Sequence, residues 1–191
     1  MIWFTSDWHI QHKNVIDFCN RPFASLEEMH EVLVANVNKL VKPADTLVFV
    51  GDITFGNTTI TKTVIDKINC TCVAIIGNHD PKYGSLLNMG FKLAVNTMSM
   101  TIHDHQVIVS HYPFKPPFWA RVLGRIAKME LRYIDRRPPK TRNTYLIHGH
   151  THSKKRFEGY ALHVGVDAWD YKPVSMKQIE THIHRHSIGE D

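Results

Sequence analysis

The chain has 191 residues, of which 43% are hydrophobic, so it is long enough for one well-packed domain and too short for two large ones. It contains no run of about 18 apolar residues, which excludes a conventional membrane-spanning helix. The formal net charge is +5, and the positive charges concentrate between residues 115 and 142.

The three cysteines have neither an even count nor metal-type spacing, which is typical of reduced thiols in the cytoplasm. The N-terminal stretch MIWFTSDWH begins an apolar strand, so we expect no cleaved signal peptide. A cytoplasmic protein without a membrane partner is the expectation, and its oligomeric state is left open.

Strand-like runs alternate with helical patterns in the first half of the chain, and hairpin-like pairs of strands dominate the second half. Ser25-Leu26-Glu27-Glu28 is a capping-box pattern that opens a helix ending before Pro43. The predicted strands are 1–6, 46–50, 71–76, 91–95, 97–102, 106–110, 144–148, 155–158 and 160–164, and the predicted helices are 12–19, 25–41, 58–68, 83–88 and 175–181. This order predicts two packed sheets between helical layers.

Five short polar clusters are spread through the chain, and four of them directly follow a strand-like run. Side chains at the C-terminal ends of strands converge on one edge of the sheet in an α/β protein, so we expect these clusters to meet. Any single cluster would fit a turn or a helix cap, but all five together are hard to explain in that way. The clusters are Asp7-Trp8-His9, Gly51-Asp52, Gly77-Asn78-His79-Asp80, Ser110-His111 and His148-Gly149-His150-Thr151-His152.

The candidate metal ligands comprise two carboxylates, four imidazoles and one amide: Asp7, His9, Asp52, Asn78, His111, His150 and His152. Mixed oxygen and nitrogen donors favour first-row divalent ions, with manganese expected first and iron, nickel or zinc as alternatives, over magnesium or calcium. No thiolate belongs to the set, which argues against a structural zinc site. Two such ions clamp the attacking and leaving oxygens of a displacement and lower the pKa of a bound water to about 7, so the set predicts a hydrolytic site.

The series D-x-H, GD, GNHD, SH and GHTH, in this order and spacing, resembles the calcineurin-like metallophosphoesterase superfamily. The stretches SDWHIQHKNVIDFCNRPF and VGVDAWDYKPVS are similar to a small bacterial and phage subfamily. The resemblance implies a four-layer α/β/β/α sandwich that forms a single domain over residues 1–191. It also implies Asp7, His9, Asp52 and His152 around one metal, and Asp52, Asn78, His111 and His150 around the other, with Asp52 bridging.

His79 matches the family position that meets the substrate phosphate and protonates the leaving oxygen. The implied mechanism is attack by a metal-bridging hydroxide with His79 as general acid. Asp80 would orient His79 or a neighbouring loop. Arg21 and Lys115 lie near motif loops and could hold phosphate oxygens, so we expect them beside Asn78 and His79 among the substrate contacts.

A basic helical insertion is predicted at about 115–142, between the ligands His111 and His150, where it would overhang the metal site. Arg121, Arg125, Lys128, Arg132 and Arg136 form a basic stripe at helical spacing, beside an apolar face of Trp119, Val122, Ile126, Met129 and Tyr133. The stripe fits the solvated side of a packed helix, a contact with a dimer partner or anionic surface, or an electrostatic lip that attracts a nucleotide or nucleic acid. The aromatic residues Tyr112, Phe114, Phe118 and Trp119 would either stack on a base or pack the helix down.

These observations predict a metal-dependent phosphoric ester hydrolase. A phosphodiester in a nucleotide or short nucleic acid is the favoured substrate, and a phosphomonoester or phosphoprotein is the alternative. A non-catalytic, metal-bound scaffold and a nucleic-acid-binding protein acting through its basic helix are the rivals. Elsewhere, His148 is expected in an outer shell or buried, and His182, His184 and His186 are expected in an exposed, frayed C-terminus.

Overall fold

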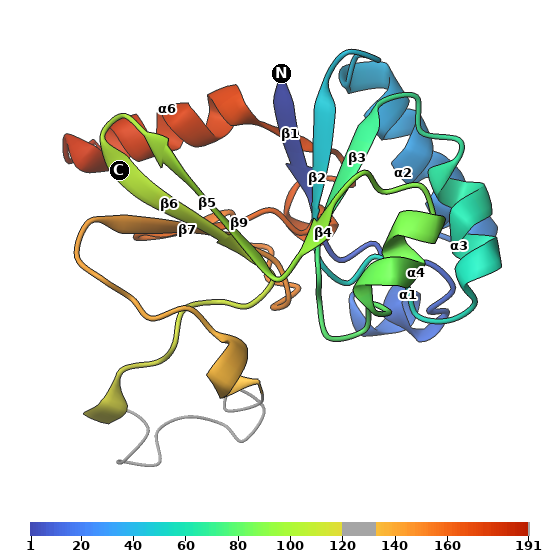
Figure 1. Ribbon diagram of the computed structural model, residues 1–191, viewed down its shortest axis with the longest axis horizontal. Coiled ribbons are helices and arrows are strands. Elements are labelled where there is room, and N and C mark those ends of the chain that lie inside the picture. The colour runs from blue at the N-terminus through green and yellow to red at the C-terminus, as the bar shows by residue number, and fades with distance from the viewer. Residues whose placement is uncertain (120–132, 191) are drawn as a thin grey trace.

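The computed structural model describes residues 1–119 and 133–190, and Figure 1 shows two sheets side by side with helices flanking them. The first sheet has the strand order β10-β1-β2-β3-β4, with β1 to β4 parallel and β10 antiparallel to β1. Its strands are β1 (Ile2–Thr5), β2 (Thr46–Val50), β3 (Thr71–Ile75), β4 (Ala94–Val95) and β10 (Val174–Ser175). Because β1, β2 and β3 run in register and in parallel, the loops that follow them leave the same edge of the sheet.

The second sheet has the order β5-β6-β7-β9-β8 and is also mixed. The strands β6, β7 and β9 are parallel, and antiparallel β5 and β8 lie at the two edges. Its strands are β5 (Thr97–Ile102), β6 (His105–Ser110), β7 (Thr144–His148), β8 (Phe157–Glu158) and β9 (Ala161–His163). A two-residue turn joins β5 to β6, and His103 and Asp104 both take the left-handed backbone that such hairpins require.

Helices α1 to α4 lie against the first sheet, and α6 lies beside the second (Figure 1). Ser25 caps α2 by accepting a hydrogen bond from the Glu28 N–H at 3.1 Å, and a complete capping box opens α6 at Ser175. The helices are α1 (Asn14–Phe18), α2 (Leu26–Leu40), α3 (Thr58–Ile65), α4 (Tyr83–Asn88) and α6 (Met176–Ser187), with 3-10 turns η2 (Ile134–Arg136) and η3 (Val166–Ala168). No helix in the described residues is long and apolar enough to cross a membrane.

Two hydrophobic clusters hold these layers together. One packs Met29, Leu33 and Val37 of α2 against the first sheet. The other joins the two sheets, because it contains residues of both, such as Val48 of the first sheet and Val109 of the second, and it includes apolar residues of α6. This arrangement confirms the predicted α/β fold of two mixed sheets flanked by helices.

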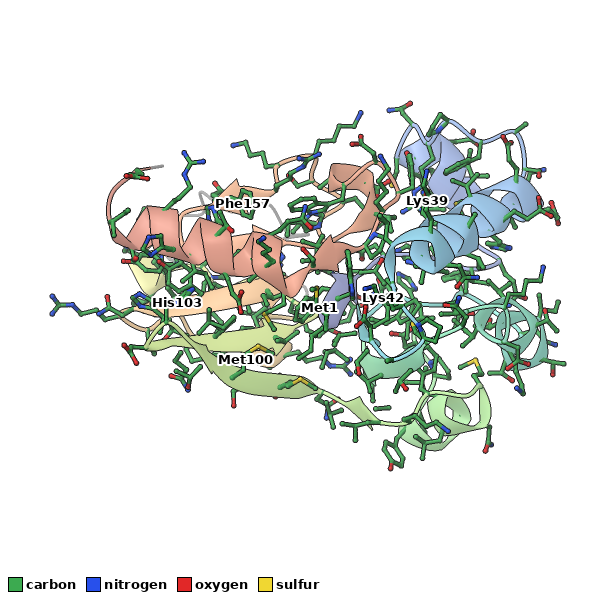
Figure 2. All side chains as sticks on the ribbon, turned by 90° about the horizontal axis from the view of Figure 1, so that it is seen from above. Met1, Lys39, Lys42, Met100, His103 and Phe157 are labelled. Carbon is green, nitrogen blue, oxygen red and sulfur yellow. The ribbon has the colours of Figure 1, made fainter. Side chains whose placement is uncertain are left out.

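The C-terminal segment differs from the prediction, because the chain remains helical to Ser187 instead of fraying. His182 is buried, and its ring stacks at 3.7 Å on Phe157, which lies against α6 in Figure 2. His186 lies one turn further along and contacts the Tyr145 hydroxyl at 2.9 Å. These histidines therefore anchor α6 to the second sheet.

The predicted basic helix falls mostly on residues 120–132, which lie outside the described part of the chain. Arg121, Arg125, Lys128 and Arg132 of the basic stripe, and Val122, Ile126 and Met129 of the apolar face, belong to that segment. Within the described residues, Arg136 lies in the single turn η2. The insertion as a whole stays a prediction.

Candidate metal centre

The predicted ligands lie in the loops that follow β1, β2, β3, β6 and β7, where the carboxyl ends of both sheets meet. Two groups of three donors converge there. Asp7, His9 and His152 form one group, and Asp52, His111 and His150 form the other, with one ligand atom of each residue within 4.8 Å of the others. The strand ends thus bring together residues up to 145 positions apart in sequence, Asp7 and His152.

Asp52 lies between the two groups. Its Oδ2 is 3.3 Å from His111 Nε2 on one side and 3.6 Å from His9 Nε2 on the other. His111 Nε2 is also 3.2 Å from Asn78 Oδ1, so the Asn78 side chain belongs to the second group. A carboxylate in this place could bind a metal ion in each of the two groups at once.

Two pairs of imidazole nitrogens face each other in the cluster. His9 Nε2 and His152 Nε2 are 3.1 Å apart, and His111 Nε2 and His150 Nδ1 are also 3.1 Å apart. Two facing ring nitrogens can share only one proton, whereas a cation accepts lone pairs from both. The buried oxygen and nitrogen donors therefore fit divalent metal ions of the first row.

The backbone bends sharply at the candidate ligands. Five of them have a left-handed backbone, with φ between 50° and 70°: Asp7, His9, Asp52, His150 and His152. This conformation is uncommon outside glycine and is held here by hydrogen bonds between loops. The Asp7 N–H donates to Gly51 O at 3.1 Å, the His9 N–H donates to Asp52 O at 3.0 Å, and the His150 N–H donates to Asp7 Oδ1 at 3.0 Å.

Gly77 and Gly149 allow these loops to approach one another. A Cβ atom on Gly149 would lie 1.9 Å from Ser6 Oγ, and one on Gly77 would lie 2.2 Å from Asp52 Oδ1. Neither position has room for a larger residue. The glycines of the GNHD and GHTH motifs are thus explained by close packing against the candidate ligands.

Burial is one of two influences on the protonation of the cluster. It raises the pKa of Asp7, and it lowers the pKa of His9 to about 2 and that of His150 to about 3, so both imidazoles are neutral at neutral pH. Burial acts against the charge on Asp52 as well, but the hydrogen bond with His111 holds the pKa of Asp52 below its usual range. His9, His150 and Asp52 are thus in the forms that bind metal ions. The other two imidazoles differ, because hydrogen bonds to Asp52 and Asp167 raise the pKa of His111 to about 9 and that of His152 to about 10 against the effect of burial, so these two would release protons when a metal ion binds.

His79 and Asp80 follow the candidate ligand Asn78 in the same loop. The His79 side chain is 35% exposed, and its Nε2 is 4.0 Å from Asp52 Oδ2, so it stands at the mouth of the cluster. The Asp80 carboxylate binds the backbone instead of the His79 ring, because its Oδ1 accepts the Ile53 N–H at 2.7 Å and its Oδ2 accepts the Gly77 N–H at 2.8 Å. Of the two roles predicted for Asp80, these contacts favour orienting the loop over orienting the His79 ring.

Arg21 does not face the cleft, contrary to the expectation that it contacts the substrate. Its side chain is fully buried, and it binds Asp167 through Nε at 2.8 Å and Nη2 at 2.9 Å. Nη2 also donates to the Asp7 carbonyl at 2.7 Å. Asp167 Oδ2 in turn lies 2.9 Å from His152 Nδ1, and Cys19 Sγ is 3.3 Å from the same nitrogen.

Asp167 and Cys19 were absent from the predicted site. Asp167 contacts Nδ1 of the His152 ring, so Nε2 is the ring nitrogen that faces the cluster. Burial alone would lower the pKa of His152, but the contact with Asp167 raises it to about 10. The only sequence signal was their position inside the two subfamily-like stretches, NVIDFCNRPF and VGVDAW. Neither stretch contains a motif that would single out one residue.

His148 and His163 form a buried layer behind the cluster, with ring centroids 5.3 Å apart. His148 Nδ1 is 2.9 Å from the Gly149 carbonyl oxygen, in agreement with a buried, hydrogen-bonded role. His163 was not predicted. Both its ring nitrogens are buried without a hydrogen-bond partner among the described residues, its Nε2 is 4.0 Å from Asp7 Oδ2, and burial lowers its pKa to about 3.

A cavity of about 210 Å³ opens onto the cluster, lined by His9, Asp52, Asn78, His79, Tyr133, His150 and His152. Lys115 is not among these residues. Its backbone N–H donates to Pro138 O at 2.9 Å, and its side chain is half-buried. Contact between Lys115 and substrate therefore stays a prediction.

Known proteins resemble the chain over nearly its whole length. Protein MJ1445 of Methanocaldococcus jannaschii, described as uncharacterized, is 29% identical over 191 residues, covering 93% of this chain and 88% of that protein. The Gene 66 protein of Mycobacterium phage L5 is 28% identical over 207 residues and 95% of each chain. The crystal structure of protein AQ665 from Aquifex aeolicus, a protein of unknown function, matches 95% of this chain and 98% of its own with a TM-score of 0.66 and 26% identity.

The family comparison agrees with the strand-end motifs. The model of the calcineurin-like phosphoesterase superfamily domain matches residues 1–164, a range that contains all the candidate ligands and the catalytic candidate His79. Hydrolysis of a phosphate ester with the help of bound metal is the reaction class that this match supports. The chain belongs to the calcineurin-like phosphoesterase superfamily.

Proposed function

We propose that the protein is a phosphodiesterase that uses two divalent metal ions, with manganese as the expected metal. The observation that carries the proposal is the position of Asp52 between two groups of buried imidazoles, with His79 at the open side. A single structural ion would not need two such groups. The proposed ligands are Asp7, His9, Asp52 and His152 for one ion, and Asp52, Asn78, His111 and His150 for the other.

The metal ions, when bound, supply a nucleophilic water and neutralise the charge of the phosphate. The chain's own residues do the rest. His79 donates a proton to the leaving oxygen, since its ring is partly exposed beside the cluster and is not buried within it. The Asn78 amide and the His79 ring hold the phosphate over Asp52.

A diester is favoured over a monoester because the cleft extends beyond the metal cluster. The cavity over the cluster has a volume of only about 210 Å³, but Asn78 also lines a larger cavity of about 640 Å³ beside it. A substrate with groups on both sides of phosphorus would occupy both. The described residues next to the cluster also include the cation Arg136, which favours an anionic substrate such as a nucleotide.

The test is hydrolysis of bis-p-nitrophenyl phosphate and p-nitrophenyl phosphate by metal-stripped protein with manganese, nickel, zinc or magnesium added back. Cleavage of the diester, restored by manganese or nickel, is the expected result. Cleavage of the monoester alone would replace the proposal by a phosphatase. No cleavage of either ester by protein shown by elemental analysis to hold two metal ions would favour a non-catalytic scaffold.

A further inference from the structure

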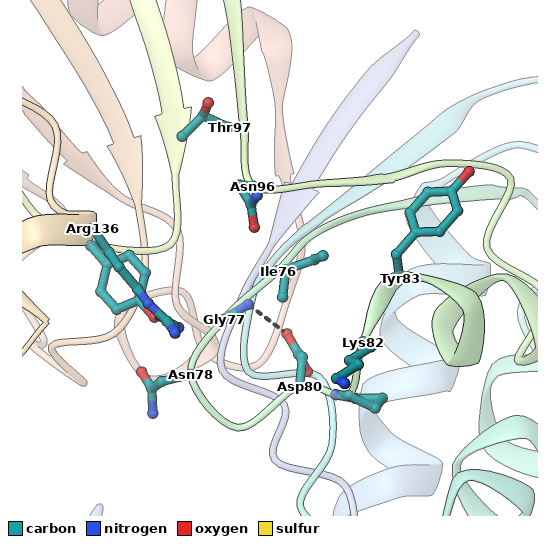
Figure 3. A pocket seen from close by; sticks show the side chains of 11 residues that line it. Ile76, Gly77, Asn78, Asp80, Lys82, Tyr83, Asn96, Thr97 and Arg136 are labelled. Carbon is teal, nitrogen blue, oxygen red and sulfur yellow. Dashed lines mark hydrogen bonds between the residues drawn. The ribbon is translucent and has the colours of Figure 1, made fainter.

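The larger cavity next to the metal cluster is shown in Figure 3. It has a volume of about 640 Å³, within the range of pockets that bind small organic ligands. Asn78 lines this cavity and also the one over the metal cluster, so the two cavities are neighbours at that side chain. A substituent on a phosphate at the cluster would therefore lie next to this cavity.

The described lining residues carry two cations on opposite sides. Figure 3 shows Arg136 on one side of the cavity and Lys82 on the other, with Asn96 and Thr97 along a third side. The ion pairs within the described chain do not include Lys82. Its ammonium group is therefore available to an anion.

Asp80 carries the only carboxyl group among these lining residues, and both of its oxygens accept backbone hydrogen bonds, including the one to Gly77 drawn in Figure 3. The two cations outnumber this one carboxylate, so the lining is net positive, with amide and hydroxyl groups between the two cations. This chemistry disfavours a lipid tail or another apolar group.

Aromatic rings complete the lining. The Tyr112 ring contacts the ligand His111 at 5.0 Å between centroids, and its hydroxyl accepts a hydrogen bond from Arg136 Nη1 at 3.2 Å. This contact fixes the Arg136 guanidinium beside the cleft, and a planar guanidinium can stack on a base or bind a phosphate. Tyr83 is half exposed on the opposite side and offers a second ring face.

We propose that this cavity binds a nucleotide unit of the substrate, with the base between the aromatic and amide side chains and a further phosphate on Lys82 or Arg136. The inference rests on the proposed phosphodiesterase activity and adds a substrate class to it. Its volume, its two cations and its position beside the cluster at Asn78 together favour a nucleotide over a simple alkyl or aryl ester. The predicted substrate is a phosphodiester within a short nucleic acid or dinucleotide.

The test uses three esters that share one leaving group, p-nitrophenol. They are methyl p-nitrophenyl phosphate, p-nitrophenyl thymidylate, and p-nitrophenyl thymidylate with a phosphate on its free sugar hydroxyl. We expect kcat/KM to rise about tenfold from the first ester to the second and about tenfold again to the third, the factor of one charge-assisted hydrogen bond. Equal kcat/KM for all three esters would overturn the inference while leaving the phosphodiesterase proposal intact.

Two cavity variants locate the effect. Lys82→Ala and Arg136→Gln should each lower the ratio of kcat/KM between the third and first esters several-fold. Lys92→Ala is the control, because this exposed lysine lies outside the lining of the cavity, and it should keep the native ratio. A ratio that stays native in both cavity variants would refute the assignment.

Calorimetry separates this inference from the proposed activity if no ester is cleaved with any metal. Thymidine bisphosphate is titrated into native, Lys82→Ala, Arg136→Gln and Lys92→Ala protein, each loaded with manganese. Weaker binding in Lys82→Ala or Arg136→Gln, with native binding in Lys92→Ala, would support the cavity as a nucleotide site even though the phosphodiesterase proposal had failed. Binding that is absent from the native protein, unchanged in both cavity variants, or weakened equally in Lys92→Ala would overturn it.

Discussion

Replacing Asp167 by asparagine removes one charge from a buried chain of contacts and keeps the shape of the side chain. The Asp167 side chain is 2% exposed and joins the fully buried Arg21 to the candidate ligand His152. The asparagine cannot accept two bonds from the guanidinium and another hydrogen bond from the imidazole as a carboxylate does. We therefore expect two separable effects, one on folding and one on metal binding.

The effect on folding follows from Arg21, which would be left as a buried charge without its partner. Removing one member of a buried ion pair costs about 3–5 kcal/mol of the free energy of unfolding. The effect on metal binding follows from His152, whose ring loses the group that orients it. Loss of such an outer-shell carboxylate lowers metal affinity by about 10–100-fold, equivalent to about 1.4–2.8 kcal/mol.

Urea denaturation of metal-free protein measures the first effect, and calorimetric titration with manganese measures the second. Asp170→Asn is the matched control, since Asp170 is 77% exposed and pairs with Arg156 at 3.5 Å on the surface. Its free energy of unfolding should change by less than about 0.5 kcal/mol, with manganese affinity unaltered. Native stability together with native manganese affinity in Asp167→Asn would show that these contacts neither hold the loops nor orient His152.

Five further substitutions test the site and its packing. Asp52→Asn should abolish metal-dependent hydrolysis and lower the amount of bound metal measured by elemental analysis. His79→Ala should keep the metal and lose most turnover, above all on esters with poor leaving groups. Equal activity in both variants and the native protein would contradict the assigned roles. Gly149→Ala should destabilise the protein by at least about 2 kcal/mol in urea titrations because its Cβ would overlap Ser6, while Gly84→Ala in α4, where the added Cβ meets open space, should stabilise it by about 0.4–1 kcal/mol. The pKa of His163 falls from 6.5 to about 3 on folding, so the unfolded chain binds more protons between these values and stability declines as pH drops from 6.5 towards 3. His163→Leu should reduce that slope in metal-free protein by up to about 1.4 kcal/mol per pH unit, and an unchanged slope would assign the acid sensitivity to other groups.

The strands and most helices could be predicted because their patterns are local. Strands 46–50, 97–102 and 144–148 and helix 83–88 have the predicted bounds, since each is an apolar or periodic run with clear limits. The run 91–95 forms only a two-residue strand, β4, because the segment before Ala94 follows α4 closely and has only two main-chain hydrogen bonds to β3, from Lys92 N–H to Cys72 O and from Ala74 N–H to Leu93 O. The predicted C-terminal helix, 175–181, ends six residues before the observed one, which continues to Ser187. The spacing of the histidines in this segment does not indicate that two of them pack on the second sheet.

The sequence predicts only those site residues that the strand topology brings together. Clusters at strand ends converge whatever the details of packing, so the carboxylates and imidazoles could be named in advance. Arg21 and Asp167 are 146 residues apart, and their pairing depends on how η3 folds back over the loop after α1. A lone arginine near a phosphate site is as consistent with substrate binding as with an ion pair, and only its burial decides between them.

The same contacts that shape the candidate metal centre also join the two sheets. The His150 N–H, in the loop after β7 of the second sheet, donates to the Asp7 carboxylate in the loop after β1 of the first. Each left-handed residue in these loops costs about 1–3 kcal/mol and persists only where the surrounding structure fixes it. Because cations that bind the cluster would stabilise only the folded arrangement, metal binding and the docking of the two sheets should be linked, and chelation should lower the unfolding temperature of the whole domain instead of loosening the loops alone.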